Sequence, residues 1–147
     1  MEERTYEQVA LIGAGVIGSG WATRCLAKGL SVVLTDPSAD ARSQVKKTIE
    51  GAWPVLEDSG LVSQGDPTNF RFVETIQEAV EGADFIQENV PEREDLKIKV
   101  HETIDRYAAE DVVIASSSSG LLPSRLQDQC QYPVSYTHLT LPTNREV

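Results

Sequence analysis

Short apolar runs alternate with amphipathic stretches along most of this chain. The runs are rich in Val, Ile, Leu and Phe, as expected of strands buried on both faces of a parallel sheet. They cover residues 8–12, 31–35, 70–73, 84–88 and 112–115. Between them, helical spacing and helix-start signals predict helices over residues 16–28, 38–59, 75–82 and around Leu96–Tyr107. The second of these helices is expected to kink at Pro54, and the third begins with a capping box.

This alternation predicts the fold class. Repeated strand–helix–strand units favour an α/β architecture, a Rossmann-like doubly wound and mostly parallel sheet with helices on both faces. Such sheets bind ligands at the carboxyl ends of their strands. A serine run at residues 116–119 directly follows the last predicted strand and therefore lies at that edge.

A glycine motif joins the first strand to the first helix. Gly13-Ala14-Gly15-Val16-Ile17-Gly18 reads G-x-G-x-x-G, and Asp36 ends the next strand 18 residues later. This β-α-β pattern is the dinucleotide fingerprint: Gly13 allows a tight turn, Gly15 lets the backbone approach a pyrophosphate, and Gly18 permits close helix–strand packing. The helix N-terminus offers free N–H groups to phosphates. The alternative is a structural glycine turn that binds nothing.

The residue at position 36 bears on the choice of dinucleotide. The carboxylate of Asp36 can accept hydrogen bonds from ribose hydroxyls and would repel a 2′-phosphate, which favours NAD over NADP as cofactor. Arg42, the nearest basic residue after it, lies a turn or more into the next helix.

Composition narrows the class of protein. The 147 residues suffice for one domain, and the net charge of −10 argues against a nucleic-acid partner. Cys25 is expected to be a small core residue, and no spacing of Cys and His suggests a metal site. Neither a signal peptide nor a membrane-spanning run is evident, so we expect a cytoplasmic enzyme with a small-molecule substrate.

Several segments together resemble the NAD-binding domain of the L-3-hydroxyacyl-CoA dehydrogenase superfamily. Besides the glycine motif these are residues 84–88, 91–97 and 116–121. Residues 51–54, 85–88 and 119–124 are most similar to the branch whose members oxidise L-carnitine. The alternatives to this branch are the one whose members act on 3-hydroxybutyryl-CoA and the one that includes lambda-crystallin and gulonate dehydrogenase.

The resemblance implies roles for four further residues. Glu92 and Lys97 match the pair that contacts the cofactor near the nicotinamide ribose; the alternative is an ordinary surface charge pair at a helix start. Ser119 matches the serine that hydrogen-bonds the substrate hydroxyl and orients the catalytic histidine. Ser117 matches a cofactor-side position that is asparagine in the acyl-CoA enzymes. For both serines the alternative is a polar helix N-terminus in which one of them is simply a cap.

The second predicted helix departs from the acyl-CoA enzymes. The serine and lysine that hold the CoA phosphates there fall at Ala52 and Ser59 here, next to Glu57 and Asp58. Carboxylates disfavour a polyanionic CoA, whereas a compact cationic 3-hydroxy acid such as carnitine fits better. Trp53 is a candidate cation–π surface for a trimethylammonium group, although such a residue is more often part of a core.

The last residues do not continue the resemblance. We expect residues 1–133 to form a truncated NAD-binding domain and 134–147 to be a non-native tail, so that the sixth strand is missing and the sheet is incomplete at the C-terminus. The family's catalytic histidine would fall near Thr140, and His138 lacks its sequence context. His101 is expected at the surface.

These features lead to one hypothesis and its competitors. We expect the parent protein to be a homodimer with a helical C-terminal domain and to oxidise a 3-hydroxy acid with NAD. We expect this chain to bind NAD but to lack activity. A nucleotide-binding module without redox chemistry and a nonbinding structural remnant are the competing hypotheses.

Overall fold

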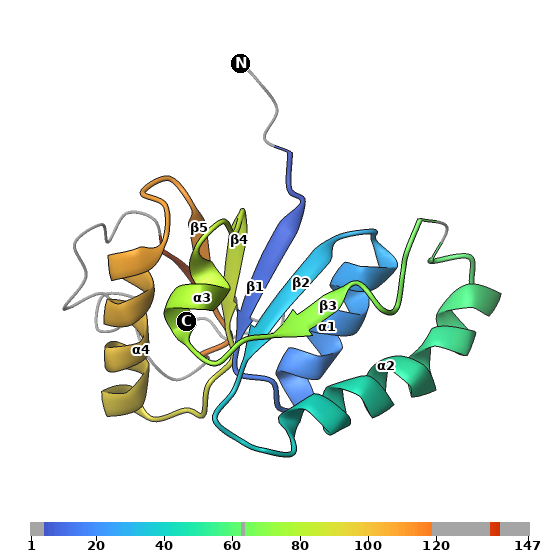
Figure 1. The fold of residues 1–147 in the computed structure, drawn as a ribbon, viewed down its shortest axis with the longest axis horizontal. Coiled ribbons are helices and arrows are strands. Elements are labelled where there is room, and N and C mark those ends of the chain that lie inside the picture. The colour runs from blue at the N-terminus through green and yellow to red at the C-terminus, as the bar shows by residue number, and fades with distance from the viewer. Residues whose placement is uncertain (1–4, 63, 119–135, 139–147) are drawn as a thin grey trace, which may run out of the picture.

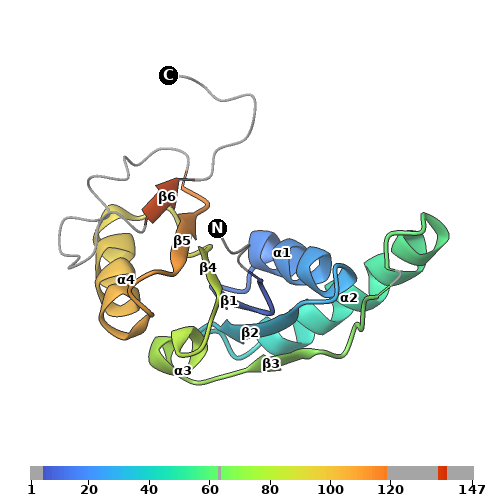
Figure 2. The same cartoon turned by 90° about the horizontal axis from the view of Figure 1, so that it is seen from above.

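Parallel strands form a single six-stranded sheet in the order β3-β2-β1-β4-β5-β6 (Figure 1 labels β1 to β5, and Figure 2 also labels β6). The computed structural model describes residues 5–62, 64–118 and 136–138. The strands are β1 (Gln8–Ile12), β2 (Ser31–Thr35), β3 (Phe70–Phe72), β4 (Phe85–Glu88), β5 (Val113–Ser116) and β6 (Tyr136–His138). The helices are α1 (Val16–Ala27), α2 (Ala41–Asp58), α3 (Ile76–Val80) and α4 (Glu94–Tyr107).

Alternate side chains of the sheet pack into two separate cores. Val9 and Leu11 of β1 face the first core with α1 and α2, whereas Ala10 and Ile12 face the second with α3 and α4. Figure 2 shows these two helix pairs on opposite sides of the sheet. Burial on both faces explains why the strands read as continuous apolar runs rather than as alternating patterns.

The order in which strands are added to the sheet reverses between β1 and β4. It builds β2 and β3 on one side of β1, then crosses to pair β4 with the other side, Val9 lying opposite Phe85 and Ile12 opposite Glu88. The loops that leave the carboxyl ends of β1 and β4 therefore diverge. This topological switch point is where doubly wound sheets form a ligand crevice.

Most predicted elements are present within one or two residues of the expected bounds. The helix predicted through Pro54 is continuous from Ala41 to Asp58, with the proline inside it. Cys25 is buried as expected, and burial raises the pKa of its thiol to about 11. Trp53 is 8% exposed and packs in the first core, so its ring does not present the cation–π surface considered above.

Two expectations are wrong. A sixth strand is present: Tyr136–His138 pairs in parallel with β5, with Ile114 opposite Tyr136, and extends the edge that β5 would otherwise leave unpaired. His101 is fully buried rather than exposed, because it lies on the face of α4 that covers the sheet. Ser119 and Cys130 lie outside the described residues, as do most residues of the tail.

Candidate functional site

The turn between β1 and α1 has a shape that its glycines make possible. Gly13 has a φ of +98°, and a Cβ there would lie 2.8 Å from the carbonyl carbon of Asn89. A Cβ on Gly18 would lie 2.2 Å from the carbonyl oxygen of Gly13. At Gly15 an added Cβ would meet nothing within 4 Å. The turn is therefore closed on its protein side and open toward the cavity.

The first turn of α1 lacks the usual partners for its free N–H groups. Gly15 is the N-cap residue, so no side chain caps the helix, and no acidic residue lies in its first turn. Val16 and Ile17 are 92% and 57% exposed. Because unpaired N–H groups and the positive end of the helix dipole coincide here, this end of α1 can accept an anionic ligand.

Asp36 is fixed beside this turn by two backbone groups. The N–H of Ala14 donates to its Oδ2 at 2.7 Å, and the N–H of Ser38 donates to its Oδ1 at 2.8 Å. Each carboxylate oxygen has a second lone pair available for a further donor. The carboxylate is thus oriented before any ligand arrives, with capacity to accept hydrogen bonds from a diol.

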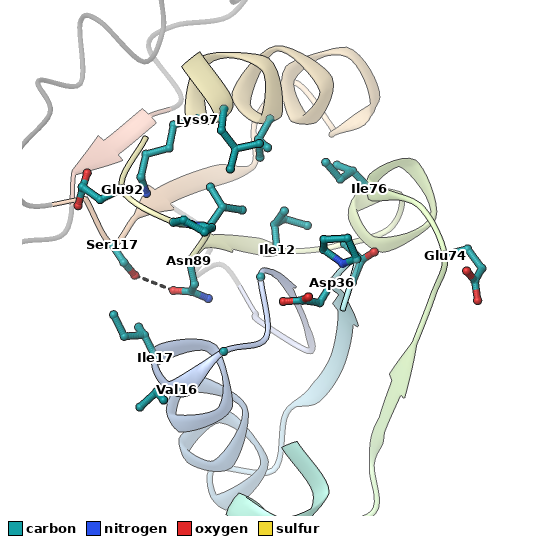
Figure 3. A pocket seen from close by; sticks show the side chains of 18 residues that line it. Ile12, Val16, Ile17, Asp36, Glu74, Ile76, Asn89, Glu92, Lys97 and Ser117 are labelled. Atoms are coloured by element: carbon teal, nitrogen blue, oxygen red, sulfur yellow. Dashed lines mark hydrogen bonds between the residues drawn. The ribbon is translucent and has the colours of Figure 1, made fainter. Parts of the chain in front are cut away.

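A cavity of about 700 Å³ lies over the switch point (Figure 3). This volume is within the range of small-molecule and cofactor sites. Eight of the predicted cofactor residues line it, namely Gly13, Gly15, Val16, Ile17, Asp36, Glu92, Lys97 and Ser117. The two others, Ala14 and Gly18, are not among the lining residues; Ala14 donates its N–H to Asp36, and Gly18 packs closely against the carbonyl of Gly13.

Polar side chains meet at the ends of β4 and β5 on one side of the cavity. The hydroxyl of Ser117 donates to Oδ1 of Asn89 at 2.6 Å and accepts from Nε2 of Gln87 at 2.7 Å. Figure 3 shows Asn89 and Ser117 facing each other across this edge. Oε1 of Gln87 and Nδ2 of Asn89 are buried without a hydrogen-bond partner among the described residues. Such orphaned groups are often completed by a ligand or by water.

A buried carboxylate lies on the opposite side of the same strand ends. Glu88, the last residue of β4, is fully buried and accepts from Nζ of Lys97 at 2.6 Å and from Oγ of Ser116 at 2.6 Å. Nε2 of His101 lies 2.7 Å from its Oε1, and the N–H of Val90 donates to Oε2 at 2.8 Å. We call Glu88, Lys97, His101 and Ser116 the Glu88 cluster.

The Glu88 cluster keeps its carboxylate ionised. Burial alone would raise the pKa of Glu88, but hydrogen bonds from His101, Lys97 and Ser116, together with the charge of Lys97, lower it to about 2. A buried charge is tolerated when it is paired and hydrogen-bonded. The cluster also fixes the loop after β4 and the first turns of α4, which form one wall of the cavity.

Glu92 and Lys97, which the resemblance places near the nicotinamide ribose, both line the cavity, and each has a different hydrogen-bond partner. Lys97 is 1% exposed and pairs with Glu88, whereas the exposed Glu92 accepts a hydrogen bond from Oγ of Ser118. Lys97 is therefore no ordinary surface charge. Sequence reasoning missed Glu88, Gln87 and Asn89; the available signal was three consecutive polar residues at the carboxyl end of a buried strand.

Two features that would point to other classes of protein are absent from the described residues. No group of three His, Cys, Asp or Glu side chains there is arranged to hold a metal ion. No helix in the described part of the chain has both the length and the apolar character needed to cross a membrane.

Comparison with known proteins identifies the family of this chain and several similar proteins. A family model described as "3-hydroxyacyl-CoA dehydrogenase, NAD binding domain" matches residues 8–144, past the boundary at 133 that we expected. The chain is 51% identical over 124 residues to L-carnitine dehydrogenase from Burkholderia mallei, covering 84% of this chain and 39% of that protein. It is 45% identical over 133 residues to L-carnitine dehydrogenase from Bacillus cereus, covering 90% and 41%. The chain thus spans about two fifths of the length of these relatives.

A solved structure agrees with the fold. The structure of 5-formyl-3-hydroxy-2-methylpyridine 4-carboxylic acid 5-dehydrogenase, described as an NAD⁺-dependent dismutase, superposes with a TM-score of 0.80 at 36% identity. The similarity covers 91% of this chain and 44% of that one.

Proposed function

The chain belongs to the NAD-binding domain family of the 3-hydroxyacyl-CoA dehydrogenases, and on this premise we propose that its cavity binds NAD across the switch point. The observation that carries the proposal is the glycine turn, closed by Gly13 and Gly18 and open at Gly15. The uncapped N-terminus of α1 would hold the pyrophosphate, and Asp36 would accept the adenosine ribose hydroxyls. The opposite end of the cavity, at Glu92, Lys97 and Ser117, would then receive the nicotinamide half.

The residues present fit such a dinucleotide. The space at Gly15 lets phosphate oxygens approach backbone N–H groups, and Asp36 is already oriented by Ala14 and Ser38. The orphaned amide atoms of Gln87 and Asn89 leave polar capacity next to the nicotinamide end. Bound there, NAD would supply an acceptor for the hydride of an alcohol substrate.

For the whole protein we propose NAD-dependent oxidation of a small 3-hydroxy acid, most simply L-carnitine to 3-dehydrocarnitine. The two carnitine dehydrogenases above support this substrate, as does the acidic end of α2, where Glu57 and Asp58 would disfavour CoA phosphates. Ser119 would hydrogen-bond the substrate hydroxyl and orient the catalytic histidine. That histidine would belong to sequence other than these 147 residues, and the whole protein would be a homodimer.

The description of the family itself favours a second candidate, a 3-hydroxyacyl-CoA substrate. A protein with the length of the carnitine dehydrogenases, built on this domain, would be assayed with L-carnitine and with 3-hydroxybutyryl-CoA. We expect a higher kcat/KM for L-carnitine. A preference for the thioester would overturn the substrate assignment while leaving the cofactor assignment intact.

The cofactor assignment is tested by calorimetric titration of the 147-residue chain with NAD and with NADP. We expect tighter binding of NAD, and Asp36→Ala should reduce the preference. Asp36→Asn is the matched control, because it removes the charge but keeps an acceptor for the N–H of Ala14. Equal or tighter binding of NADP by the unmodified chain would refute the assignment.

A further inference from the structure

A buried ion pair stands behind one end of the cavity. Lys97 is the one cationic residue among the described residues that line this cavity, and it is 1% exposed. Its ammonium lies 2.6 Å from Oε2 of Glu88, which is fully buried. Neither charge is neutralised by solvent, so each acts on its surroundings with little screening.

The charges of Glu88 and Lys97 balance each other. Glu88 contributes one negative charge and Lys97 one positive charge, while Ser116 and the N–H of Val90 donate neutral hydrogen bonds. His101 contacts the same carboxylate through Nε2 and is left unchanged in every variant described below.

Other charged groups also line the cavity. Asp36 lies at the other end of the cavity, and the exposed Glu92 is hydrogen-bonded to Ser118. The carboxylates of Glu74 and Glu92 also line the cavity and keep their charge in every variant below, so differences among the variants report on Glu88 and Lys97.

The two redox forms of a nicotinamide differ in charge. The oxidised ring is cationic and the reduced ring is neutral, so a nearby unbalanced ammonium would disfavour the oxidised form alone. If the adenosine ribose binds at Asp36, the nicotinamide ring lies at the end of the cavity that Lys97 lines. This step rests on the proposed function.

We propose that the Glu88–Lys97 pair sets the relative affinity of this domain for oxidised and reduced nicotinamide. Glu88 balances the ammonium of Lys97, which otherwise would exclude the cationic ring. Both are positioning residues for electrostatics rather than catalytic residues. By linkage, a tenfold change in the affinity ratio shifts the potential of the bound two-electron couple by about 30 mV.

Two single variants move the ratio in opposite directions. Glu88→Gln leaves the positive charge of Lys97 without its partner, and the ratio Kd(NAD⁺)/Kd(NADH) should rise roughly five- to tenfold. Lys97→Met leaves one negative charge, and the same ratio should fall by a similar factor. Lost contacts weaken both forms alike and cancel in the ratio. General structural damage therefore cannot produce opposite shifts.

The double variant Glu88→Gln/Lys97→Met is the decisive protein. It removes both charges, so the ratio should return to within about twofold of that of the unmodified chain. Neutral replacement of a buried pair is better tolerated than loss of one partner, so this variant should fold even if Glu88→Gln does not. In that case the fall in Lys97→Met and its reversal in the double variant still test the proposal.

The measurements are NADH fluorescence titration, calorimetry with NAD⁺, and calorimetry with AMP, all at pH 8. AMP reports only the adenosine end and should bind all variants equally. Glu102→Gln, on α4 like Lys97 but outside the cavity lining, removes an equal charge and should leave the ratio unchanged. An unmoved ratio, or shifts of the same sign in both single variants, would overturn the inference. Failure of the unmodified chain to bind either dinucleotide would instead overturn the proposed function.

Discussion

The two ends of the cavity are built in different ways. The end at α1 is built mostly from main chain, a glycine turn and an uncapped helix N-terminus, with one oriented carboxylate, that of Asp36. The end at β4 and β5 consists of side chains from three elements, with Glu88, Lys97 and His101 all fully or almost fully buried. The first end leaves donors open to a ligand, whereas the second satisfies its charges internally.

This difference teaches which kind of site tolerates change. A main-chain site depends on conformations that few residues allow, so small substitutions there act by steric exclusion. A buried charge cluster depends on mutual compensation, so removing one member leaves the others unpaired. The following predictions separate these two sources of sensitivity.

The largest effect expected is on turnover, because we assign no general base to either end. The 147-residue chain should form no NADH at an enzymatic rate with L-carnitine. Absence of a general base alone costs ~10²–10⁴ in rate, and loss of substrate positioning adds to this. The check is a steady-state absorbance assay beside a His138→Ala variant. Robust turnover that disappears in the variant would contradict both the truncation and our view of His138.

Truncating the central carboxylate should test the side-chain end directly. Glu88→Ala leaves the ammonium of Lys97 buried and unpaired, which should lower the free energy of unfolding by about 3–5 kcal/mol. Chemical denaturation gives the value. Glu102→Ala, at an acidic residue of α4 outside the cluster, is the control and should change it by less than about 0.5 kcal/mol. A loss below about 1 kcal/mol for Glu88→Ala would mean that the cluster is not a source of stability.

Acid should weaken the same end. The pKa of Glu88 is lowered from 4.5 to about 2 in the folded chain. A carboxylate whose pKa is lowered by folding contributes stability at pH values above its pKa in the unfolded chain. This contribution is lost as the pH falls, here between about pH 5 and pH 2. The expected loss is about 3 kcal/mol, measured by denaturation at several pH values. Glu88→Gln should show a correspondingly flatter profile, and an equally steep one would contradict the assignment.

A pair of glycine variants tests the main-chain end. Gly18→Ala places a Cβ 2.2 Å from the carbonyl oxygen of Gly13 and should destabilise the domain by ~1–3 kcal/mol. Gly15→Ala meets nothing within 4 Å and should unfold at nearly the same temperature as the unmodified chain. It should nevertheless bind NAD about tenfold more weakly, a difference of roughly 1.4 kcal/mol. Equal binding would show that phosphate does not approach Gly15.

The sequence predicts best those features that depend on neighbouring residues. The strands follow from short apolar runs, and Thr75 caps α3 as predicted, with the N–H of Glu78 donating to Oγ1 of Thr75 at 3.1 Å. The glycine motif and Asp36 lie within one strand–helix–strand unit, so their proximity follows from local geometry. Their location at one cavity was therefore predictable.

Features that depend on partners distant in sequence are not predictable in the same way. Sequence alone places His101 at the surface, because a lone histidine among charged residues fits a solvated helix face. Its partner, Glu88, lies on a strand 13 residues away. Proximity in sequence suggests that Lys97 pairs with Glu92, but in the structure Lys97 pairs with Glu88. The register of β4 and β5 also places Ser116 beside Glu88. Only the packed sheet fixes these choices.

The hydrogen bond from Ala14 to Asp36 has a consequence for engineering the cofactor preference. The group that would distinguish the two dinucleotides is also a brace for the phosphate turn, since the N–H of Ala14 donates to it at 2.7 Å. A redesign toward NADP that replaced Asp36 with a small apolar residue would relax the turn while it removed the charge. Retargeting this site therefore requires a neutral acceptor at position 36, with the new cation introduced elsewhere.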